Sequence, residues 1–267
     1  MKFTKKITLP LLASALAFGL TGCGNQDESV IKIGATVGPH AQVVEAVAKE
    51  AEKQGINIEV VEFSDYITPN AALADGSIDL NSYQHQPFLD NYNDAHSSHL
   101  VSIGRSILMR MGVYSNKYDN LESIPENARI AIPNDPTNGG RGLLLLEEAG
   151  LITLNENAGY SASLNDIVSN PKNIKIVEVD AAQLPRTLDD VDAAAITMNY
   201  VMSSGLNPKE QGIYLESKDA PLAVMVVASR NADKDKEVYE QIMSIYHSKA
   251  INDFLASTFK GTIEAAN

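Results

Sequence analysis

The sequence has little cysteine, no tryptophan and few basic residues. Its single cysteine, Cys23, excludes internal disulfides and cysteine-rich zinc or iron–sulfur sites. Only 21 Lys and Arg stand against 34 Asp and Glu, which gives the 267 residues a formal charge of −13. This acidic balance argues against a general nucleic-acid or phosphate-binding protein, so we expect no nucleic-acid partner. Aromatic residues are scarce at 6%, so a loop that gathers several of them stands out.

Long hydrophobic runs are also missing, except near the N-terminus. There a basic stretch, Met1–Lys6, precedes an apolar run, Ile7–Leu20. Pro10 and Gly19 interrupt this run, which is too short for an ordinary membrane-spanning helix. A basic flank followed by such a run is typical of a secretory signal peptide. Its removal would take its lysines with it and lower the formal charge to about −16. We expect the remaining chain to be soluble.

The apolar run ends in Leu20-Thr-Gly-Cys23, and a polar tether follows up to Ser29. Here the sequence resembles bacterial lipoprotein precursors, whose Leu-x-Gly-Cys box is cut before the cysteine after its thiol receives a diacylglycerol. The resemblance implies a signal peptide over residues 1–22, a tether over residues 23–29 that is lipidated at Cys23, and an exported protein anchored to a membrane of the cell envelope. The alternative is a stray cysteine in a conventional signal peptide.

From Val30 onward, short β-branched runs alternate with amphipathic helical stretches. The expected strands are Ile31–Thr36, Ile56–Phe63, Ile78–Leu80, Val101–Tyr114, Arg129–Ile132, Ile174–Val179, Ala193–Thr197 and Ala223–Ala228. The expected helices include Ala41–Gln54, Pro69–Ala74, Pro87–Ala95, Gly140–Glu148, Tyr200–Ser204, Lys236–Tyr246 and Ala250–Phe259. Strands separated by helical crossovers predict the α/β class with parallel sheets. Two successive units predict two α/β lobes rather than an eight-stranded barrel.

Parallel sheets bind ligands beyond the carboxyl ends of their strands, so the loops after the expected strands are the places to search. The richest loop reads Pro-Asn-Asp-Pro-Thr-Asn-Gly-Gly-Arg and ends at Arg141. Thr137 or Asn138 can cap the helix that follows, and Gly139 and Gly140 would let a ligand approach the backbone. A helix start together with the planar cation of Arg141 predicts a carboxylate pocket. The alternative is a capped helix with a surface arginine.

Two further loops gather polar and aromatic side chains. The loop after Leu80 carries amides together with Tyr83 and His85, which are able to hydrogen-bond a small zwitterion. The loop after Phe63 offers the carboxylate of Asp65 to an ammonium group and Tyr66 as an apolar wall. For the loop after Leu80 the alternative is that Gln84 and His85 only satisfy the loop backbone, and for the loop after Phe63 it is an exposed turn. The three loops together predict a cleft between the lobes.

Signals for catalysis or metal binding are weak. His96 and His99 lie near Asp90 and Asp94, but no third ligand follows at a characteristic metal-site spacing. A Gly-x-Ser-x-Gly motif is absent, and no serine lies in a sequence motif that indicates a nucleophile. We therefore expect no enzyme, no metal site and no cofactor.

Several specific stretches match one family in family order and span nearly the whole chain after the tether. They are Phe63-Ser-Asp-Tyr-Ile-Thr-Pro-Asn70, Ile78-Asp-Leu-Asn81, Tyr83-Gln-His-Gln-Pro-Phe88, Ile132-Pro-Asn-Asp-Pro-Thr-Asn138 through Arg141, Asn170-Pro-Lys-Asn173, Gln183-Leu-Pro-Arg-Thr-Leu-Asp-Asp190 and Asn199-Tyr200. In these stretches the sequence resembles the methionine-type substrate-binding lipoproteins of bacterial ABC importers (the NlpA/MetQ lipoprotein family). The resemblance implies a periplasmic-binding-protein-like fold, with two α/β lobes joined by a hinge and the ligand in the interlobe cleft. The first lobe would comprise residues 30–108 and 228–267, and the second residues 109–227.

Carried over to this sequence, the resemblance implies that Arg141 holds the ligand carboxylate and that Asn199 lies near the ligand's main-chain groups. Tyr66, Tyr83 and His85 would line the pocket. The implied function is a lipid-anchored, monomeric solute-binding component of an ABC importer, which captures methionine and delivers it to a membrane permease. We expect Arg141→Ala to weaken binding strongly and to change the melting temperature of the ligand-free protein little.

The sequence departs from the family pattern where side-chain recognition matters. Met109 and Arg110 replace an aromatic–proline pair in the crossover strand, and Thr197 replaces an asparagine. Arg110 could point inward and select a polar side chain, or it could lie outward on the surface. The alternatives for the ligand are therefore a methionine-containing dipeptide or another amino acid. A surface lipoprotein without a transport role, such as an adhesin or scaffold, is a further alternative.

Overall fold

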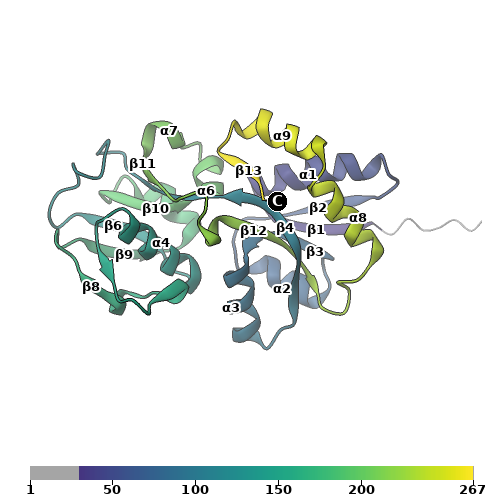
Figure 1. The fold of residues 1–267 in the computed structure, drawn as a ribbon, viewed down its shortest axis with the longest axis horizontal. Coiled ribbons are helices and arrows are strands. Elements are labelled where there is room, and N and C mark those ends of the chain that lie inside the picture. Colours follow the sequence, from purple (N-terminus) through teal and green to yellow (C-terminus); the bar gives the residue numbers. More distant parts are fainter. Residues whose placement is uncertain (1–29, 267) are drawn as a thin grey trace, which may run out of the picture.

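The computed structural model describes residues 30–266, which form two lobes, each built around one sheet with helices packed against it (Figure 1). The expected signal peptide, the tether and Cys23 lie outside the described residues. Strands and helices alternate along the chain, which confirms the α/β class and the two-lobe architecture.

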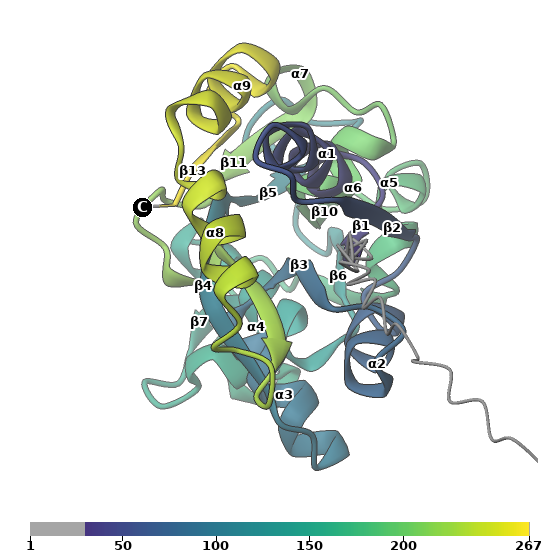
Figure 2. The same cartoon turned by 90° about the vertical axis from the view of Figure 1, so that its right-hand side faces the viewer.

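The first lobe contains a six-stranded sheet in the order β13-β4-β12-β3-β1-β2. Its strands are β1 (Ile31–Thr36), β2 (Ile58–Phe63), β3 (Leu80–His85), β4 (Leu100–Met109), β12 (Val224–Arg230) and β13 (Ile263–Ala265). Its helices are α1 (Pro39–Glu52), α2 (Thr68–Asp75), α3 (Gln86–His96), α8 (Glu237–Tyr246) and α9 (Lys249–Phe259). Figure 2 views this lobe from its end, where the C-terminal helices α8 and α9 pack against α1 and so join the two ends of the described chain in one layer.

The second lobe contains a five-stranded sheet in the order β11-β5-β10-β6-β9. Its strands are β5 (Met111–Tyr114), β6 (Arg129–Pro133), β9 (Lys175–Val179), β10 (Ala193–Thr197) and β11 (Gly212–Leu215). Its helices are α4 (Pro136–Glu148), α5 (Leu184–Thr187), α6 (Met198–Ser203) and α7 (Pro208–Gln211), and a small separate pair is formed by β7 (Thr153–Leu154) and β8 (Ile167–Ser169). Figure 1 shows this lobe beside the first, with α6 between them.

The expectation of parallel sheets is right only at the centre of each sheet. The strand β1 runs parallel to β2 and β3, and β6 runs parallel to β9 and β10. The ladders that β4, β5, β11 and β12 form in the two sheets are antiparallel. These four strands belong to the two chain segments that pass between the lobes, and they run in the opposite direction to the strands they pair with. The short edge strands β11 and β13 carry no periodic pattern long enough to predict a strand.

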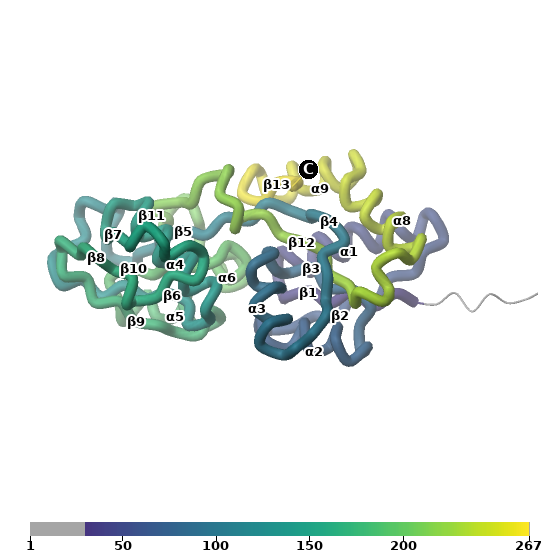
Figure 3. Tube along the Cα trace, turned by 60° about the horizontal axis from the view of Figure 1, so that its bottom comes forward, coloured from purple at the N-terminus to yellow at the C-terminus, as the bar shows by residue number. Residues whose placement is uncertain are grey.

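Two segments connect the lobes (Figure 3). Only Arg110 separates β4 in the first sheet from β5 in the second, and residues 216–223 lead back from β11 to β12. The expected return boundary at residue 228 falls inside β12, which belongs as a whole to the first sheet. We therefore propose to move that boundary to residues 216–223, so that the return crossing lies directly before Val224.

The third strand differs from its expected position. The sequence predicted a strand at Ile78–Leu80 and a loop after it, whereas β3 runs over Leu80–His85 and all of its residues are buried. Its buried amides need partners. The side chains of Asn70 and Gln84 exchange two hydrogen bonds of 2.8 and 2.7 Å, and Asn81 donates to Asn70 Oδ1 at 2.9 Å. Buried polar residues of this kind break the alternation of apolar and polar residues from which strands are predicted. This explains why the sequence predicted a loop after Leu80.

The described residues contain no helix that is long and apolar enough to cross a membrane. Within the same residues, no three metal-ligating side chains of the His, Cys, Asp or Glu type come together. His96, considered above as a metal ligand, instead stacks on the ring of Tyr92 with centroids 4.2 Å apart, and its Nδ1 lies 3.0 Å from the Tyr92 carbonyl oxygen.

Candidate functional site

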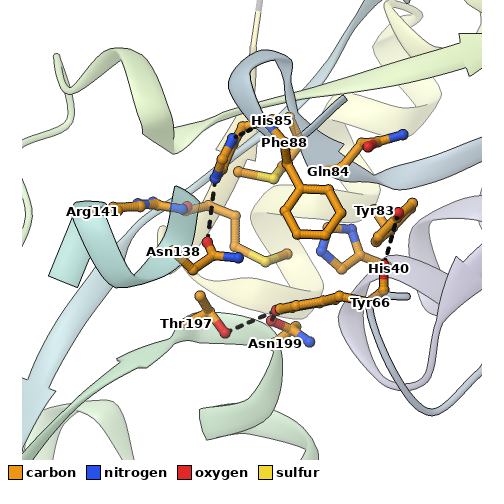
Figure 4. A pocket seen from close by; sticks show the side chains of 12 residues that line it. His40, Tyr66, Tyr83, Gln84, His85, Phe88, Asn138, Arg141, Thr197 and Asn199 are labelled. Atoms are coloured by element: carbon orange, nitrogen blue, oxygen red, sulfur yellow. Dashed lines mark hydrogen bonds between the residues drawn. The ribbon is translucent and has the colours of Figure 1, made fainter. Parts of the chain in front are cut away.

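A cavity of about 320 Å³, counting its mouth, lies between the two lobes (Figure 4). Its wall combines aromatic, imidazole, amide and sulfur-containing side chains with one guanidinium, from His40, Tyr66, Tyr83, Gln84, His85, Phe88, Met109, Asn138, Arg141, Thr197, Asn199 and Met225. All five residues singled out in the sequence line this one cavity, although they are spread over more than half of the chain: Tyr66, Tyr83, His85, Arg141 and Asn199. The fold therefore brings the candidate residues together at one place.

The first lobe contributes an aromatic wall. The ring of Tyr66, from the loop after β2, has its centroid 6.0 Å from the rings of both Tyr83 and Phe88, and the Tyr83 hydroxyl donates to the Tyr66 carbonyl oxygen at 3.1 Å. Burial raises the pKa of both the Tyr66 and the Tyr83 hydroxyl, so both remain neutral. This wall is apolar apart from the hydroxyl groups at its edge.

The Tyr66 hydroxyl reaches across the cleft to the second lobe. It donates to Asn199 Oδ1 at 2.5 Å and lies 2.9 Å from Thr197 Oγ1. Since the phenol has one proton and gives it to Asn199, the Thr197 hydroxyl is the donor in the second contact. The end of β10 and the start of α6 place these two side chains side by side. Tyr66 therefore holds the two lobes together in the closed arrangement.

A second hydrogen-bonded chain crosses the cleft at His85, the N-cap residue of α3. Its Nδ1 accepts from the backbone N–H of Phe88 at 3.2 Å, so the proton of the neutral ring is on Nε2, which lies 3.2 Å from Asn138 Oδ1 and donates to it. The amide of Asn138 in turn donates to both carboxylate oxygens of Asp135 at 3.1 Å. Burial, and to a smaller extent the nearby charge of Arg141, lowers the pKa of His85 to about 3. The ring is neutral at physiological pH.

The side chain of Arg141 is buried, with 3% of it exposed, and it is hydrogen-bonded through two of its nitrogen atoms. Its Nε donates to Glu216 Oε1 at 2.9 Å, and its Nη2 donates to Glu216 Oε2 at 2.5 Å and to the Met109 carbonyl oxygen at 2.9 Å. Among the described residues, Nη1 has no acceptor. The buried pair contradicts the expectation that Arg141→Ala leaves the melting temperature nearly unchanged, because this change leaves the Glu216 carboxylate buried without its partner.

The helix start is built differently from the sequence expectation. Asp135, and neither Thr137 nor Asn138, caps α4, and it accepts from the Asn138 N–H at 2.9 Å. Burial raises the pKa of the Asp135 carboxyl group, and its hydrogen bonds to Asn138 and Thr137 oppose that effect. With the first turn capped by a carboxylate, the helix amides are not the anion site; the candidate is Arg141, one turn further on.

The two glycines of this loop serve chain packing and not ligand approach. A Cβ on Gly139 would stand 2.9 Å from the Pro133 carbonyl oxygen, and one on Gly140 would stand 2.4 Å from the Tyr160 carbonyl oxygen. The space that a ligand was expected to use is thus filled by the protein's own backbone. Gly140 allows the segment around Tyr160 to lie against α4, and Gly139 allows α4 to lie close to the end of β6.

Two other sequence-based candidates lie outside the cavity wall. The carboxylate of Asp65, expected to meet an ammonium group, accepts instead from the backbone N–H groups of Ile67 and Thr68 at 2.8 Å and closes a turn. Arg110 Nη1 lies 3.5 Å from the Glu216 carbonyl oxygen. Neither Asp65 nor Arg110 lines the cavity. Selection of a polar ligand side chain by Arg110 has no support in this geometry.

Sequence reasoning gave no role to His40, which the structure places in the wall at the start of α1. It is 2% exposed, and burial lowers its pKa to about 3. His40 Nδ1 and Asn199 Nδ2 are both buried without a hydrogen-bond partner among the described residues. Buried polar atoms are normally satisfied, so two such atoms in the wall of one cavity mark positions where a ligand can bond. The sequence gave only a slight indication of this position, because His40 simply follows Gly-Pro in the loop after the first strand.

Comparisons with known proteins agree with this architecture. The model of a family described as NlpA lipoprotein matches residues 31–266. A probable D-methionine-binding lipoprotein MetQ from Vibrio cholerae is 42% identical over 264 residues, which cover 98% of each chain. The D-methionine-binding lipoprotein MetQ of Salmonella typhimurium is 40% identical and covers 97% of each chain. A solved nutrient-binding protein from Burkholderia cenocepacia, bound to methionine, is 43% identical with a TM-score of 0.85, covering 89% of this chain and all of that one.

Proposed function

The chain belongs to the NlpA lipoprotein family, and we propose that it is the solute-binding component of an ABC importer, which captures methionine between its lobes and delivers it to a membrane permease. The observation that carries the proposal is the buried guanidinium of Arg141, which among the described residues is the single side chain with a full formal charge in the wall of the interlobe cavity. Both histidines of that wall are neutral.

The head group of an amino acid fits the polar side of the cavity. Arg141 Nη1 and Asn199 Nδ2 are donors without acceptors among the described residues, and a ligand carboxylate supplies the acceptors. A hydrogen bond between charged partners contributes about 1.5–3 kcal/mol. His40 Nδ1, if the neutral ring carries its proton on Nε2, is an acceptor for the ligand ammonium group.

The side chain of the ligand would contact the opposite wall. Phe88, Met109 and Met225 add apolar and sulfur surface to the two tyrosines there. Such a wall favours an unbranched, polarisable side chain such as a thioether over a charged one.

Closure of the lobes is the step that binding controls. A ligand shifts an open–closed equilibrium only through contacts that it makes better in the closed form. Here the donors for the head group belong to the second lobe, and the aromatic wall belongs to the first. A ligand that uses both walls is bound fully only when the lobes meet, and we propose that the permease accepts this closed form.

The anchor is a separate part of the proposal. Cys23 and the tether would hold the protein at a membrane through lipid, which leaves both lobes free to move to the permease. Cys23→Ala should release the protein from the detergent phase in a phase-partition assay without changing ligand affinity. Retention of Cys23→Ala in the detergent phase would contradict anchoring through this residue.

The function is tested by mass spectrometry of the ligand carried through native purification, followed by calorimetric titration. We expect methionine to bind more tightly than leucine, glutamate or a methionine-containing dipeptide, and titration with both enantiomers will define the stereochemical preference. A dipeptide or another amino acid that binds better would select the alternative ligand within the family. Absence of any small-molecule binding or thermal stabilisation would favour the surface adhesin or scaffold.

A further inference from the structure

Glu216 lies directly behind the arginine of the cavity and does not line it. It follows β11 at the beginning of the return crossing and is 5% exposed. Its carboxylate accepts three hydrogen bonds, two from Arg141 and one from the backbone N–H of Met111 at 2.9 Å. A buried carboxylate is retained at a cost in desolvation, which these three donors offset. The question is what this charge does for the site.

The first consequence is geometric. Glu216 occupies Nε and Nη2 of Arg141, and the Met109 carbonyl oxygen accepts a second hydrogen bond from Nη2. Met109 ends β4 and Met111 begins β5, so the guanidinium is attached to the outgoing crossing and, through Glu216, to the return crossing. The planar group is thereby fixed, and Nη1 is its one nitrogen without an acceptor among the described residues.

The second consequence is electrostatic. The formal charge of Arg141 is already matched by Glu216 before any ligand enters. The nearby Asp135 carboxyl group, connected to the wall through Asn138, adds either no charge or a negative one. His40 and His85, the other titratable groups of the wall besides the tyrosines, are neutral. The closed cavity and its immediate surroundings therefore carry no net positive charge. A ligand with a net negative charge would be buried without compensation, which is costly, whereas a zwitterion adds no net charge.

We propose that Glu216 is a positioning residue that also sets the charge class of the ligand: it directs Arg141 Nη1 at the carboxylate and restricts the cavity to net-neutral amino acids, against acids of the same shape that lack the ammonium group. This inference rests on the proposed function, since it assigns the selectivity of the same site.

The test uses the full chain purified in detergent and two ligands that differ only at the α-position. These are methionine and 2-hydroxy-4-(methylthio)butanoate, which has a hydroxyl in place of the ammonium group. We expect the wild-type protein to prefer methionine by about 100-fold or more in calorimetric titration, and Glu216→Gln to reduce that preference by about tenfold or more. The reason is that the amide variant leaves Arg141 with an uncompensated positive charge, which favours the monoanion.

Glu216→Asp is the matched control, because it keeps the charge and withdraws the carboxylate by one methylene. It should weaken methionine binding by about tenfold while the preference for methionine over the hydroxy acid stays as in the wild type. A purely structural role would lower the melting temperature in both variants without moving the preference in either. Wild-type affinity of Glu216→Asp for methionine would overturn the positioning role.

The outcomes separate this inference from the proposed function. A wild-type protein that binds neither compound contradicts the proposed function. A wild-type protein that binds the hydroxy acid as tightly as methionine overturns the charge selection even if Glu216→Gln fails to fold. A folded Glu216→Gln variant that keeps the wild-type preference overturns it as well.

Discussion

The two walls of the cavity differ in the kind of interaction they offer. The first lobe presents the rings of Tyr66, Tyr83 and Phe88, neutral imidazoles and Met225. The second lobe presents amide and hydroxyl groups and the one full charge, that of Arg141. The first wall thus offers shape complementarity and dispersion contacts to a ligand, and the second offers directional hydrogen bonds and a charge. We therefore expect that neither lobe alone binds an amino acid.

The walls also differ in how they are supported. The charged wall is attached at the crossings, where Arg141 contacts Met109 and Glu216. The aromatic wall is supported by ring contacts to both lobes, since the ring centroid of Tyr66 lies 6.0 Å from that of Tyr83 and 4.9 Å from that of Tyr200 in α6, and by the hydrogen bond from Tyr83 to Tyr66. Changes in the second wall should therefore have large effects on affinity and stability together, and changes in the first should have smaller effects on selectivity.

The largest effect is expected from Arg141→Ala. Loss of the charged contact should weaken methionine binding by about 100-fold or more. It also leaves the Glu216 carboxylate buried and unpaired, at a cost of about 3–5 kcal/mol, so the melting temperature of the ligand-free protein should fall by on the order of 10 °C. Calorimetric titration and thermal unfolding measure the two effects.

Two controls separate affinity from stability in that experiment. The exposed Arg186→Ala, in the same lobe, should change neither quantity measurably. Arg141→Met combined with Glu216→Gln removes both charges and should recover part of the melting temperature, but not the affinity. Unchanged affinity in Arg141→Ala would remove the guanidinium from the ligand site and abolish the contrast between the walls.

The neutral imidazole of His85 in the first wall predicts a pH dependence of the affinity of about tenfold. The closed structure lowers the pKa of His85 from 6.5 to about 3, so an open form that exposes the ring takes up a proton below pH 6.5 and the closed form does not. Closure is therefore favoured above pH 6.5 and is weakened as the pH falls from 6.5 toward 3. We expect methionine affinity to drop about tenfold between pH 7.5 and 5.5 on account of this residue.

His85→Gln is the variant that identifies the source of this pH dependence. Glutamine keeps a donor for Asn138 but does not titrate, so the affinity should depend less steeply on pH. His40, with its pKa also lowered to about 3, would account for a remaining slope, and His40→Gln measures that part. An affinity that is constant from pH 7.5 to 5.5 in the wild type would show that the wall does not exclude protons on closing.

The contact between the walls is tested by Tyr66→Phe, for which we expect about fivefold to tenfold weaker binding. The change removes one hydroxyl that bonds Thr197 and Asn199 across the cleft and leaves the ring in place. Fivefold to tenfold corresponds to about 0.5–0.7 kcal/mol for each of the two bonds, at the lower end of what a neutral hydrogen bond contributes, and the closed form alone contains them. The matched control is Tyr160→Phe in the second lobe, whose side chain is exposed and is not part of the cavity wall. Tighter binding by Tyr66→Phe would mean that the hydroxyl competes with the ligand for Asn199.

Much of the fold could be predicted from the sequence, because most strands and helices carry a clear pattern. The strands at Ile31–Thr36 and Ala193–Thr197 lie where β-branched and small apolar runs predicted them. The extension of β3 to His85 could not be predicted, since its buried amides are satisfied by the side chain of Asn70 in the preceding helix α2, a contact that only the folded chain makes. The antiparallel strands result from the two segments that connect the lobes. They could not be predicted, because no local sequence pattern shows where the chain passes from one lobe to the other.

The site could be predicted only in part. Its five candidate residues were found from motif resemblance and loop position, and they converge on one cavity. Glu216 could not be found in this way, because a carboxylate after a short edge strand is ordinarily a solvated surface charge. Its role comes from the pairing with Arg141, which is 75 residues away in the chain. The cap by Asp135 and the packing of Gly140 against Tyr160 are likewise tertiary facts.

The smallest effect is expected from Met225→Leu in the aromatic wall. Leucine and methionine have similar volumes, so the exchange should change methionine affinity by no more than about threefold and leave the fold intact. What should change is selectivity, because removal of the sulfur from a wall of aromatic rings reduces the polarisable surface that faces a thioether. The measurement is the ratio of the affinities for methionine and norleucine, which differ only in the sulfur. If Met225→Leu lowers the ratio of the methionine affinity to the norleucine affinity, while Arg141→Ala weakens the binding of both ligands equally, the ligand side chain contacts the first wall and its carboxylate contacts the second.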